Sequence, residues 1–422
     1  MKILLAAVLA APLCAVAAQA QSASPVATGD LLTLEEALAV AARRSPANEA
    51  AETGVWAAEA WRRVAALRPN PSITIDTENM FGTGPYRGFD ESETTVAVAF
   101  PVERGGKRAA RIASADARTR RASVDAAVAR ADLRLEVARA YIGAIAADHR
   151  AAIAESQLAV TEESLRVARD RVLVGANSPI DEQRAMLEKL RAESDAASAR
   201  RTVQAARDML RQYVGDAAPG RLDIAWFDRM PEAHQGPVVP VDVTGSLALE
   251  AAAADTALAE AALRLARSER VPDISLTAGT RRLEATNDQA MVIGLSIPLP
   301  IFNGGKATMT AARMERDRAQ ALWRAARFEA ERAIAEAEAD RDRARMAVLA
   351  AAPALAAATE AARIARVGYA EGKFDQMVLL DAERTLLEAR GAGIDARVKF
   401  HDAAALLERL TTRLNGDGGY IQ

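Results

Sequence analysis

The side chains that could do chemistry in this chain are few and widely separated. Its 422 residues include three histidines and one cysteine. His149, His234 and His401 are far apart in sequence, and none has a second ligand at the spacing typical of a metal site. No nucleophile–histidine–acid set is evident either. We therefore predict no cofactor, no metal site within one chain and no enzyme activity, and leave open a metal site shared between copies of the chain.

Two Gly-Gly-Lys runs could be mistaken for phosphate-binding loops. Such a loop requires Gly five residues before its last Gly, and Ser or Thr after the Lys. Pro300 stands at the first of these positions in the second run, and Arg108 and Ala307 follow the two lysines. We instead expect both runs to turn a strand into a long helix at a membrane boundary, where the lysines reach lipid headgroups. The residues of these turns are Gly105, Gly106, Lys107, Gly304, Gly305 and Lys306.

The first twenty residues have the pattern of a secretory signal peptide. Lys2 precedes an apolar run, and Ala18-Gln19-Ala20 is a typical cleavage site. Leu13 precedes Cys14 where a lipoprotein site would have a small residue, so the cysteine is expected to leave with residues 1–20. Beyond them no stretch approaches the ~20 apolar residues of a membrane helix; the nearest is residues 349–358. The mature chain is thus predicted to be periplasmic or to enter the outer membrane as β-structure.

Composition favours long, thin helices. Half of the residues are apolar but only 4% are aromatic, and Ala, the best helix former, is by far the most abundant of the apolar residues. The net charge of −3 gives no sign of nucleic-acid binding. Charged residues amount to 26% and are spread through long segments, which disfavours disorder.

The chain repeats itself once. Residues 101–107 are echoed by 301–306 at an offset of 199, Pro71 by Pro272 at 201, and Gly175 by Gly372 at 197. Such nearly constant offsets indicate a tandem duplication. We predict a first repeat over 21–214, a Pro-rich linker over 215–242, a second repeat over 243–414 and a tail over 415–422.

Each repeat is predicted to contain a helix, two strands, a very long helix, a break and a second long helix. The helix over 107–174 would be about 100 Å long. Its apolar positions alternate steps of four and three, as in a coiled-coil seam, from Val124 to Ile145. The expected elements of the first repeat are a helix over 33–67, strands over 72–76 and 94–102, and helices over 107–174 and 179–214. Those of the second are a helix over 243–269, strands over 274–278 and 291–297, and helices over 306–370 and 374–414.

The strands alternate polar and apolar residues, as a membrane barrel wall or an ordinary half-buried sheet would. Four strands cannot close a barrel, and an open edge is excluded in lipid. A barrel would therefore combine chains. Two chains give eight strands with an interior filled by side chains, and three give twelve strands around a lumen.

With these residues in view, the whole mature chain resembles the TolC-like outer-membrane efflux factors. The resemblance implies a mainly α protein with membrane β-structure. It would be a homotrimer whose twelve-stranded β-barrel, four strands from each protomer, continues into a periplasmic α-helical coiled-coil tunnel. It also implies a periplasmic membrane-fusion adaptor, an inner-membrane RND pump and outer-membrane lipid as partners. The pump would supply the driving force.

A narrower resemblance is to the cobalt–zinc–cadmium resistance branch, the CzcC-type channels. It rests on the runs over 68–71, 78–84, 91–95 and 103–108. Arg104 departs from it, because a Leu-like residue is more usual there. The resemblance implies a passive exit duct for divalent heavy-metal cations. The alternatives are a duct for copper, silver or organic drugs, or a periplasmic coiled-coil adaptor or scaffold.

The resemblance also assigns roles near the helix breaks. Gly175 and Gly372 would lie at the periplasmic tips that dock the adaptor. Asp181 and Asp381 match positions where acids face the periplasmic entrance, and in a three-fold pore each would form a ring of carboxylates that attracts cations. The ordinary alternatives are a helix-capping Gly and a solvated Asp.

Overall fold

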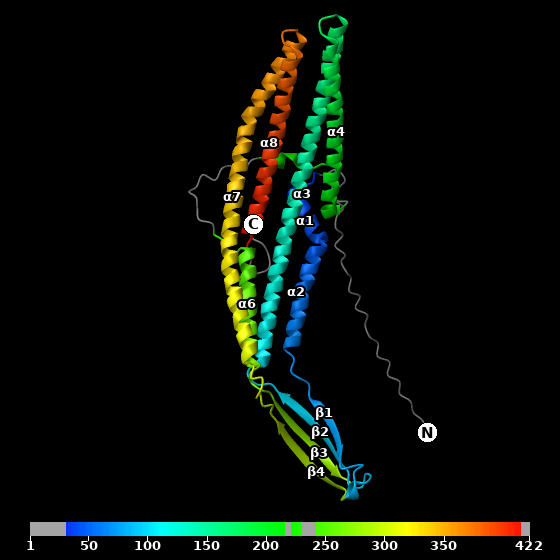
Figure 1. Ribbon diagram of the computed structural model, residues 1–422, viewed down its shortest axis with the longest axis vertical. Coiled ribbons are helices and arrows are strands. Elements are labelled where there is room, and N and C mark those ends of the chain that lie inside the picture. The colour runs from blue at the N-terminus through cyan, green and yellow to red at the C-terminus, as the bar shows by residue number, and fades with distance from the viewer. Residues whose placement is uncertain (1–30, 216–220, 230–241, 415–422) are drawn as a thin grey trace, which may run out of the picture.

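A computed structural model describes residues 31–215, 221–229 and 242–414. The expected signal peptide and the tail over 415–422 lie outside these residues. The molecule is long and thin (Figure 1), with a small sheet at one end and the tips of two helical hairpins at the other. Helices make up most of the described chain.

The first predicted helix is two helices. α1 (Leu34–Arg44) begins with the expected capping box, in which Thr33 and Glu36 bond reciprocally. α2 (Pro46–Ala65) begins one residue after Ser45, which is extended and accepts a hydrogen bond from the Asn48 backbone. The single helix over 33–67 was wrong because Pro46 disfavours helical geometry at the residue before it and is itself suited to a first helical turn.

The long helices form two hairpins. The first pairs α3 (Lys107–Leu173) with α4 (Pro179–Val214), and the second pairs α7 (Lys306–Ala370) with α8 (Gln376–Thr411). α3 has 67 residues, which corresponds to about 100 Å. α2 packs on α3, and α6 (Leu247–Ser268) packs on both α3 and α7. Residues of the predicted seam on α3, from Val124 to Ile145, are buried or half-buried.

The four strands form one antiparallel meander in the order β1-β2-β3-β4. β1 (Ser72–Glu78) and β2 (Glu93–Val102) come from the first repeat, and β3 (Ile274–Leu283) and β4 (Asp288–Ser296) from the second. The second hairpin differs from prediction: β3 runs on to Leu283 and β4 begins at Asp288. Pairing between the two strands keeps residues 279–283 and 288–290 extended although their sequence has little strand character.

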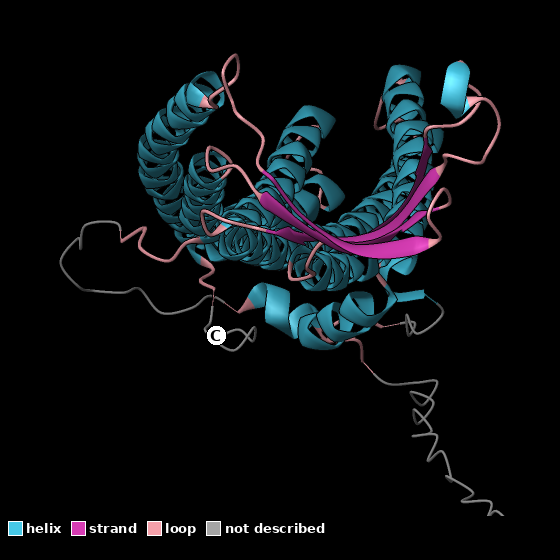
Figure 2. Ribbon diagram, turned by 90° about the horizontal axis from the view of Figure 1, so that it is seen from below, coloured by secondary structure: helices cyan, strands magenta, loops and turns pink. Residues whose placement is uncertain are grey.

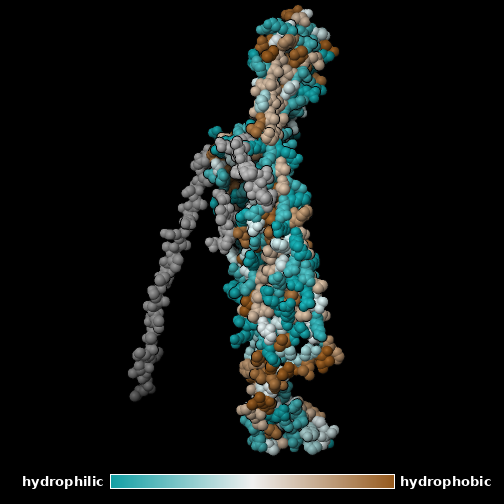
Figure 3. Space-filling model, turned by 90° about the vertical axis from the view of Figure 1, so that its left-hand side faces the viewer, coloured by the Kyte–Doolittle hydropathy of each residue, from teal (hydrophilic) through white to brown (hydrophobic). Residues whose placement is uncertain are grey.

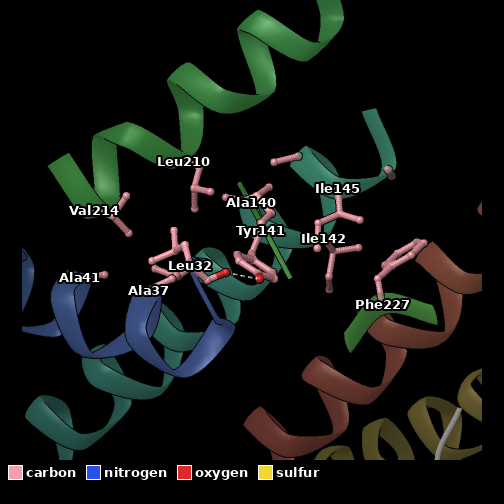
Figure 4. Packing of buried hydrophobic residues seen from close by; sticks show 14 of the residues in the cluster. Leu32, Ala37, Ala41, Ala140, Tyr141, Ile142, Ile145, Leu210, Val214 and Phe227 are labelled. Atoms are coloured by element: carbon pink, nitrogen blue, oxygen red, sulfur yellow. Dashed lines mark hydrogen bonds between the residues drawn. The ribbon is translucent and has the colours of Figure 1, made fainter. Parts of the chain in front are cut away.

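The largest core lies where α1, α3 and α4 meet (Figure 4). Tyr141 is fully buried there, and its hydroxyl donates to the Leu32 carbonyl at 2.7 Å and accepts from the Asp223 amide at 3.0 Å. Burial raises the pKa of Tyr141 to about 12. The hydroxyl therefore ties two distant segments of the chain to α3.

Part of the predicted linker belongs to this core. α5 (Ile224–Asp228) lies within 215–242, and the Phe227 side chain on it is fully buried. Leu222 also pairs with Leu32 as a parallel bridge. The prolines of this segment indicated a plain linker, but Asp223 caps the short helix by accepting from the Trp226 amide.

Ion pairs join the two hairpins along α3 and α8. Arg134 pairs with Glu408 at 2.7 Å and Arg139 with Asp402 at 2.6 Å. Arg150 pairs with Asp395 further along the same two helices. Each such exposed pair is worth at most ~1 kcal/mol, so these pairs set the register of the two helices more than they stabilise them.

α7 is more apolar than the sequence indicated. Among the described helices it alone contains an 18-residue window apolar enough to cross a membrane, with a mean hydropathy of 1.3. This corrects the expectation that no such stretch follows residue 20. The window arises from the Ala-rich part of a helix that packs against α8 through Ala344, Val348 and Phe400.

Candidate functional site

The sheet has one apolar face, and that face is exposed. The register places Ile73, Val98, Ala278 and Ile293 in one row across the four strands. Ile73 is 71% exposed and Ile293 78%. An apolar sheet face of this kind normally packs on a core or faces lipid. Figure 2 shows that the sheet is curved.

The opposite face is small and polar. One row contains Thr74, Ala97, Gly279 and Val292, and its neighbours add further small and hydroxyl side chains. Gly279 is required because a Cβ there would lie 2.4 Å from the Val96 carbonyl oxygen. Small side chains on this face leave open space beside the sheet, as the inner wall of a channel needs.

The charges of the polar face are mostly negative. Arg281 lies among them, donating to Glu93 at 2.7 Å and to Thr95 at 2.9 Å, and it pairs with Glu78 at 3.4 Å. By register, this face carries Asp76, Glu78, Glu93 and Asp288 against Arg281. A solute passing along this face would therefore meet an excess of carboxylates, which favours cations.

The hairpin tips contain the predicted glycines. Gly175 (φ +73°) follows α3 and Gly372 (φ +77°) follows α7. At both, the left-handed backbone lets the chain turn from one long helix into the next. The sequence did not reveal that the two tips are linked: Gln376 donates to the Asp181 carbonyl at 3.1 Å, and Arg171 donates to the Tyr369 carbonyl.

The two predicted acids lie near these tips in different surroundings. Asp181 is in the first turn of α4, accepts from Asn177 at 3.1 Å and lies 3.9 Å from Arg184. Asp381 is exposed on α8, at a groove that α3 and α4 also line. Asp181 is not among the residues that line this groove.

The sequence did not reveal a buried carboxylate close to Asp381 and its more exposed cationic partner. Glu383 is only 4% exposed and binds Arg366 of α7 through both carboxylate oxygens. The hydrogen bonds that Arg366 donates to the Glu383 carboxylate raise the pKa of Arg366. No spacing rule could have paired these residues, because they meet only once α7 and α8 form their hairpin.

The two Gly-Gly-Lys runs lie between a strand and a long helix, and their lysines differ in exposure and in ion pairing. Gly105 and Gly106 (φ +71° and +72°) precede α3, and Gly305 (φ +70°) precedes α7. Lys107 does not reach outward toward lipid, so the expectation for this lysine was wrong. Its ammonium pairs with Asp273 at 2.8 Å and its side chain is only 14% exposed. Lys306 is exposed, as expected, beside Gly304.

Apolar side chains surround the junction of sheet and helices. Figure 3 shows a hydrophobic band at this level of the molecule. The most exposed side chain there is Phe302, at 102%, with Ile301 at 77% and Leu67 at 64%.

The two histidines within the described residues, His149 and His401, pack beside the core residue Phe227. His401 is buried and its Nε2 lies 2.9 Å from the Phe227 carbonyl oxygen. The rings of His149 and His401 lie 5.5 and 5.2 Å from the Phe227 ring. In the described part of the chain no three His, Cys, Asp or Glu residues could hold a metal ion. His234 lies outside it.

An exposed apolar sheet face, a polar opposite face and helices of about 100 Å define an outer-membrane channel protein with a TolC-like fold. The family model for the outer membrane efflux protein matches residues 37–216 and 244–413. The chain belongs to this family, which confirms the resemblance seen in its sequence. Its place is the outer membrane, with a periplasmic helical part.

Two curated relatives come from Cupriavidus metallidurans. The cobalt-zinc-cadmium resistance protein CzcC is 28% identical over 387 residues, 90% of each chain. The nickel and cobalt resistance protein CnrC is 31% identical over 304 residues, 70% of this chain and 69% of the relative. Both carry metal-resistance names, as the narrower resemblance predicted.

Solved structures share the fold. A membrane protein from Pseudomonas aeruginosa superposes with a TM-score of 0.77 at 22% identity, covering 90% of each chain. The outer-membrane channel OprN superposes with a TM-score of 0.74 at 21% identity, covering 90% of this chain and 89% of that one.

Proposed function

We propose that this protein is the outer-membrane exit duct of a tripartite efflux system for divalent heavy-metal cations of the cobalt, zinc and cadmium class. The observation that supports this most directly is the sheet: its apolar face is exposed, while its other face is small, polar and predominantly acidic. The names of CzcC and CnrC support the choice of metal cations.

The duct is a homotrimer. β1 and β4 are both edge strands within the described chain, and an open edge is excluded in lipid. Three copies would provide twelve strands, enough to surround a lumen, whereas eight strands from two copies would leave an interior filled by side chains. The curvature of the sheet in Figure 2 suits closure into a barrel.

The chain is a passive conduit and not an enzyme. In the described part of the chain, charged side chains such as Arg139 and Asp402 form ion pairs between or along helices, and the family model that matches the chain is that of an efflux protein. The driving force comes from an inner-membrane RND pump, and a periplasmic adaptor joins that pump to the tips at Gly175 and Gly372.

Deletion of the coding region tests this proposal. The deletion strain should grow poorly on graded Co²⁺, Zn²⁺ or Cd²⁺ and recover when the full chain is restored. Ni²⁺, Cu²⁺ and an organic drug serve as further arms. Sensitivity confined to the drug, or to copper, would replace the proposed substrate class with the corresponding alternative.

A further inference from the structure

Within one chain, the two repeats meet where β2 and the turn after it contact the start of β3. We call this contact the internal junction. Lys107 pairs with Asp273 at 2.8 Å, and the Arg104 amide donates to the same carboxylate at 3.0 Å. Gly105 lies so close to Val271 that a Cβ on the glycine would be 2.7 Å from the Val271 Cβ. The turn after β2 is thus fixed on the start of β3 by charge and close packing.

The end of β2 depends on this junction. Pairing of β2 with β1 stops at Ala99, which lies opposite Ser72. Residues 100–102 pair only with β3, with Phe100 opposite Leu276 and Val102 opposite Ile274. The last part of β2 is therefore a strand only because another repeat follows it.

The second repeat ends without a following repeat, and its last strand is correspondingly short. The offset of 199 aligns Phe100 with Leu299, and Val102 with Ile301. β4 stops before both, at Ser296, and the two side chains are 75% and 77% exposed. Residues 299–301 have the pattern of a strand end but lack a strand to pair with in the described chain.

The matching free edge is β1, whose residues are all exposed. The offset of 201 aligns Ile73 with Ile274 and Ile75 with Leu276. If the internal junction repeats between copies, Leu299 faces Ile75 and Ile301 faces Ile73. All four would then lie on the apolar side of the sheet.

The chemistry of the second junction differs from that of the first. Ser72 occupies the position of Asp273, so Lys306 has no counterpart of the Lys107 ion pair. Phe302 occupies the position of Glu103, which is 14% exposed and bonded to Arg111. The first junction is held by charges, whereas the second presents apolar side chains.

We infer that residues 299–302 of one copy extend β4 along β1 of the next copy, with Leu299 opposite Ile75 and Ile301 opposite Ile73, so that an apolar junction joins the protomers. This inference rests on the proposed homotrimer. The partner is a second copy of this chain, because the internal junction already shows the same backbone pairing and the edge that completes it is β1.

Paired cysteines test the register in assembled protein. The mature chain is expected to have no cysteine, so Leu299→Cys with Ile75→Cys introduces a single pair, which cross-strand neighbours ~5 Å apart can bridge. Oxidation in outer-membrane vesicles should give covalent dimers and trimers on non-reducing gels. The matched control is Ile293→Cys with Ile75→Cys, which lies on the same apolar face but fits only a register without the extension.

The outcomes separate the inference from the proposed trimer. Covalent trimers from the first pair and none from the control support the inferred register. Covalent trimers from the control pair, or none from either pair in protein that light scattering shows to be trimeric in mild detergent, would overturn it. Monomeric protein in mild detergent would instead contradict the proposed homotrimer and the inference with it.

Discussion

Arg171 at the end of α3 places its guanidinium carbon 4.7 Å from the ring centroid of Tyr369 at the end of α7. The same side chain donates to the Tyr369 carbonyl. One residue thereby joins the tips of the two hairpins by a cation–π contact and a charged hydrogen bond. Because we propose that the tips form the periplasmic entrance, we expect this contact to limit how far that entrance opens.

Removing this link should loosen the entrance. We expect Arg171→Ala to raise the conductance of the resting channel in planar bilayers. Of the two hydrogen bonds between the tips described above, the variant would keep only the bond that Gln376 donates to the Asp181 carbonyl. Arg384→Ala is the matched control, since Arg384 pairs with Glu388 on its own helix. Equal conductance of the Arg171→Ala variant and the unmodified protein would show that this contact does not restrict the entrance.

The two acids near the tips should differ in importance. Asp381 is exposed, whereas Asp181 lies near Arg184 and accepts from Asn177. Asp381→Asn should therefore reduce cation selectivity more than Asp181→Asn does, as measured by the reversal potential in a salt gradient. Glu388→Gln serves as a control for loss of an exposed acid. An unchanged reversal potential in the double variant would remove both acids from the gate.

The Tyr141 hydroxyl should contribute to the free energy of unfolding through its two hydrogen bonds. Tyr141→Phe leaves the Leu32 carbonyl and the Asp223 amide without their hydroxyl partner, which should cost about 1–3 kcal/mol of unfolding free energy. Amide hydrogen exchange should rise in residues 31–44 and 221–229. Tyr213→Phe is the control, because its hydroxyl bond to Glu136 is 3.4 Å long and exposed. Equal effects of the two variants would contradict this role.

His401 should make the helical part sensitive to mild acid. Burial lowers its pKa from the ordinary 6.5, although the Phe227 carbonyl opposes this shift and Arg397 reinforces it. Below pH 6.5 His401 therefore binds a proton more readily in the unfolded chain than in the folded chain. The contribution of neutral His401 to the folding free energy is full above this pH and falls as the pH drops toward the lowered pKa. The thermal midpoint should fall between pH 7.5 and 5.5, and His401→Gln should reduce that fall. An identical fall in this variant would exclude His401 as its cause.

Local patterns in the sequence predicted the long elements well. The seven-residue apolar repeat and the Gly-Gly-Lys turns indicated α3 and α7 nearly to the residue, because each pattern reflects geometry within one helix or turn. The split at Ser45 was also readable, since Ser before Pro is a typical helix start. The prediction instead continued the helix from its start at residue 33 to residue 67 without using this signal.

Contacts between distant segments could not be predicted in this way. The Lys107–Asp273 and Arg366–Glu383 pairs depend on how hairpins and repeats pack, and no spacing rule links their members. α5 was missed because its apolar run is short and lies among prolines. Its contribution to the core comes from Phe227 and from the bond between Tyr141 and Asp223.

The most direct test of the proposed duct is the rate at which preloaded cells lose radioactive Zn²⁺ or Co²⁺ while the pump and adaptor are present. We expect deletion of this chain to abolish the pump-dependent loss, and the restored full chain to recover it. Loss of an organic dye should be unaffected in the same cells. A pump-dependent rate of metal loss that is the same with and without this protein would contradict the account.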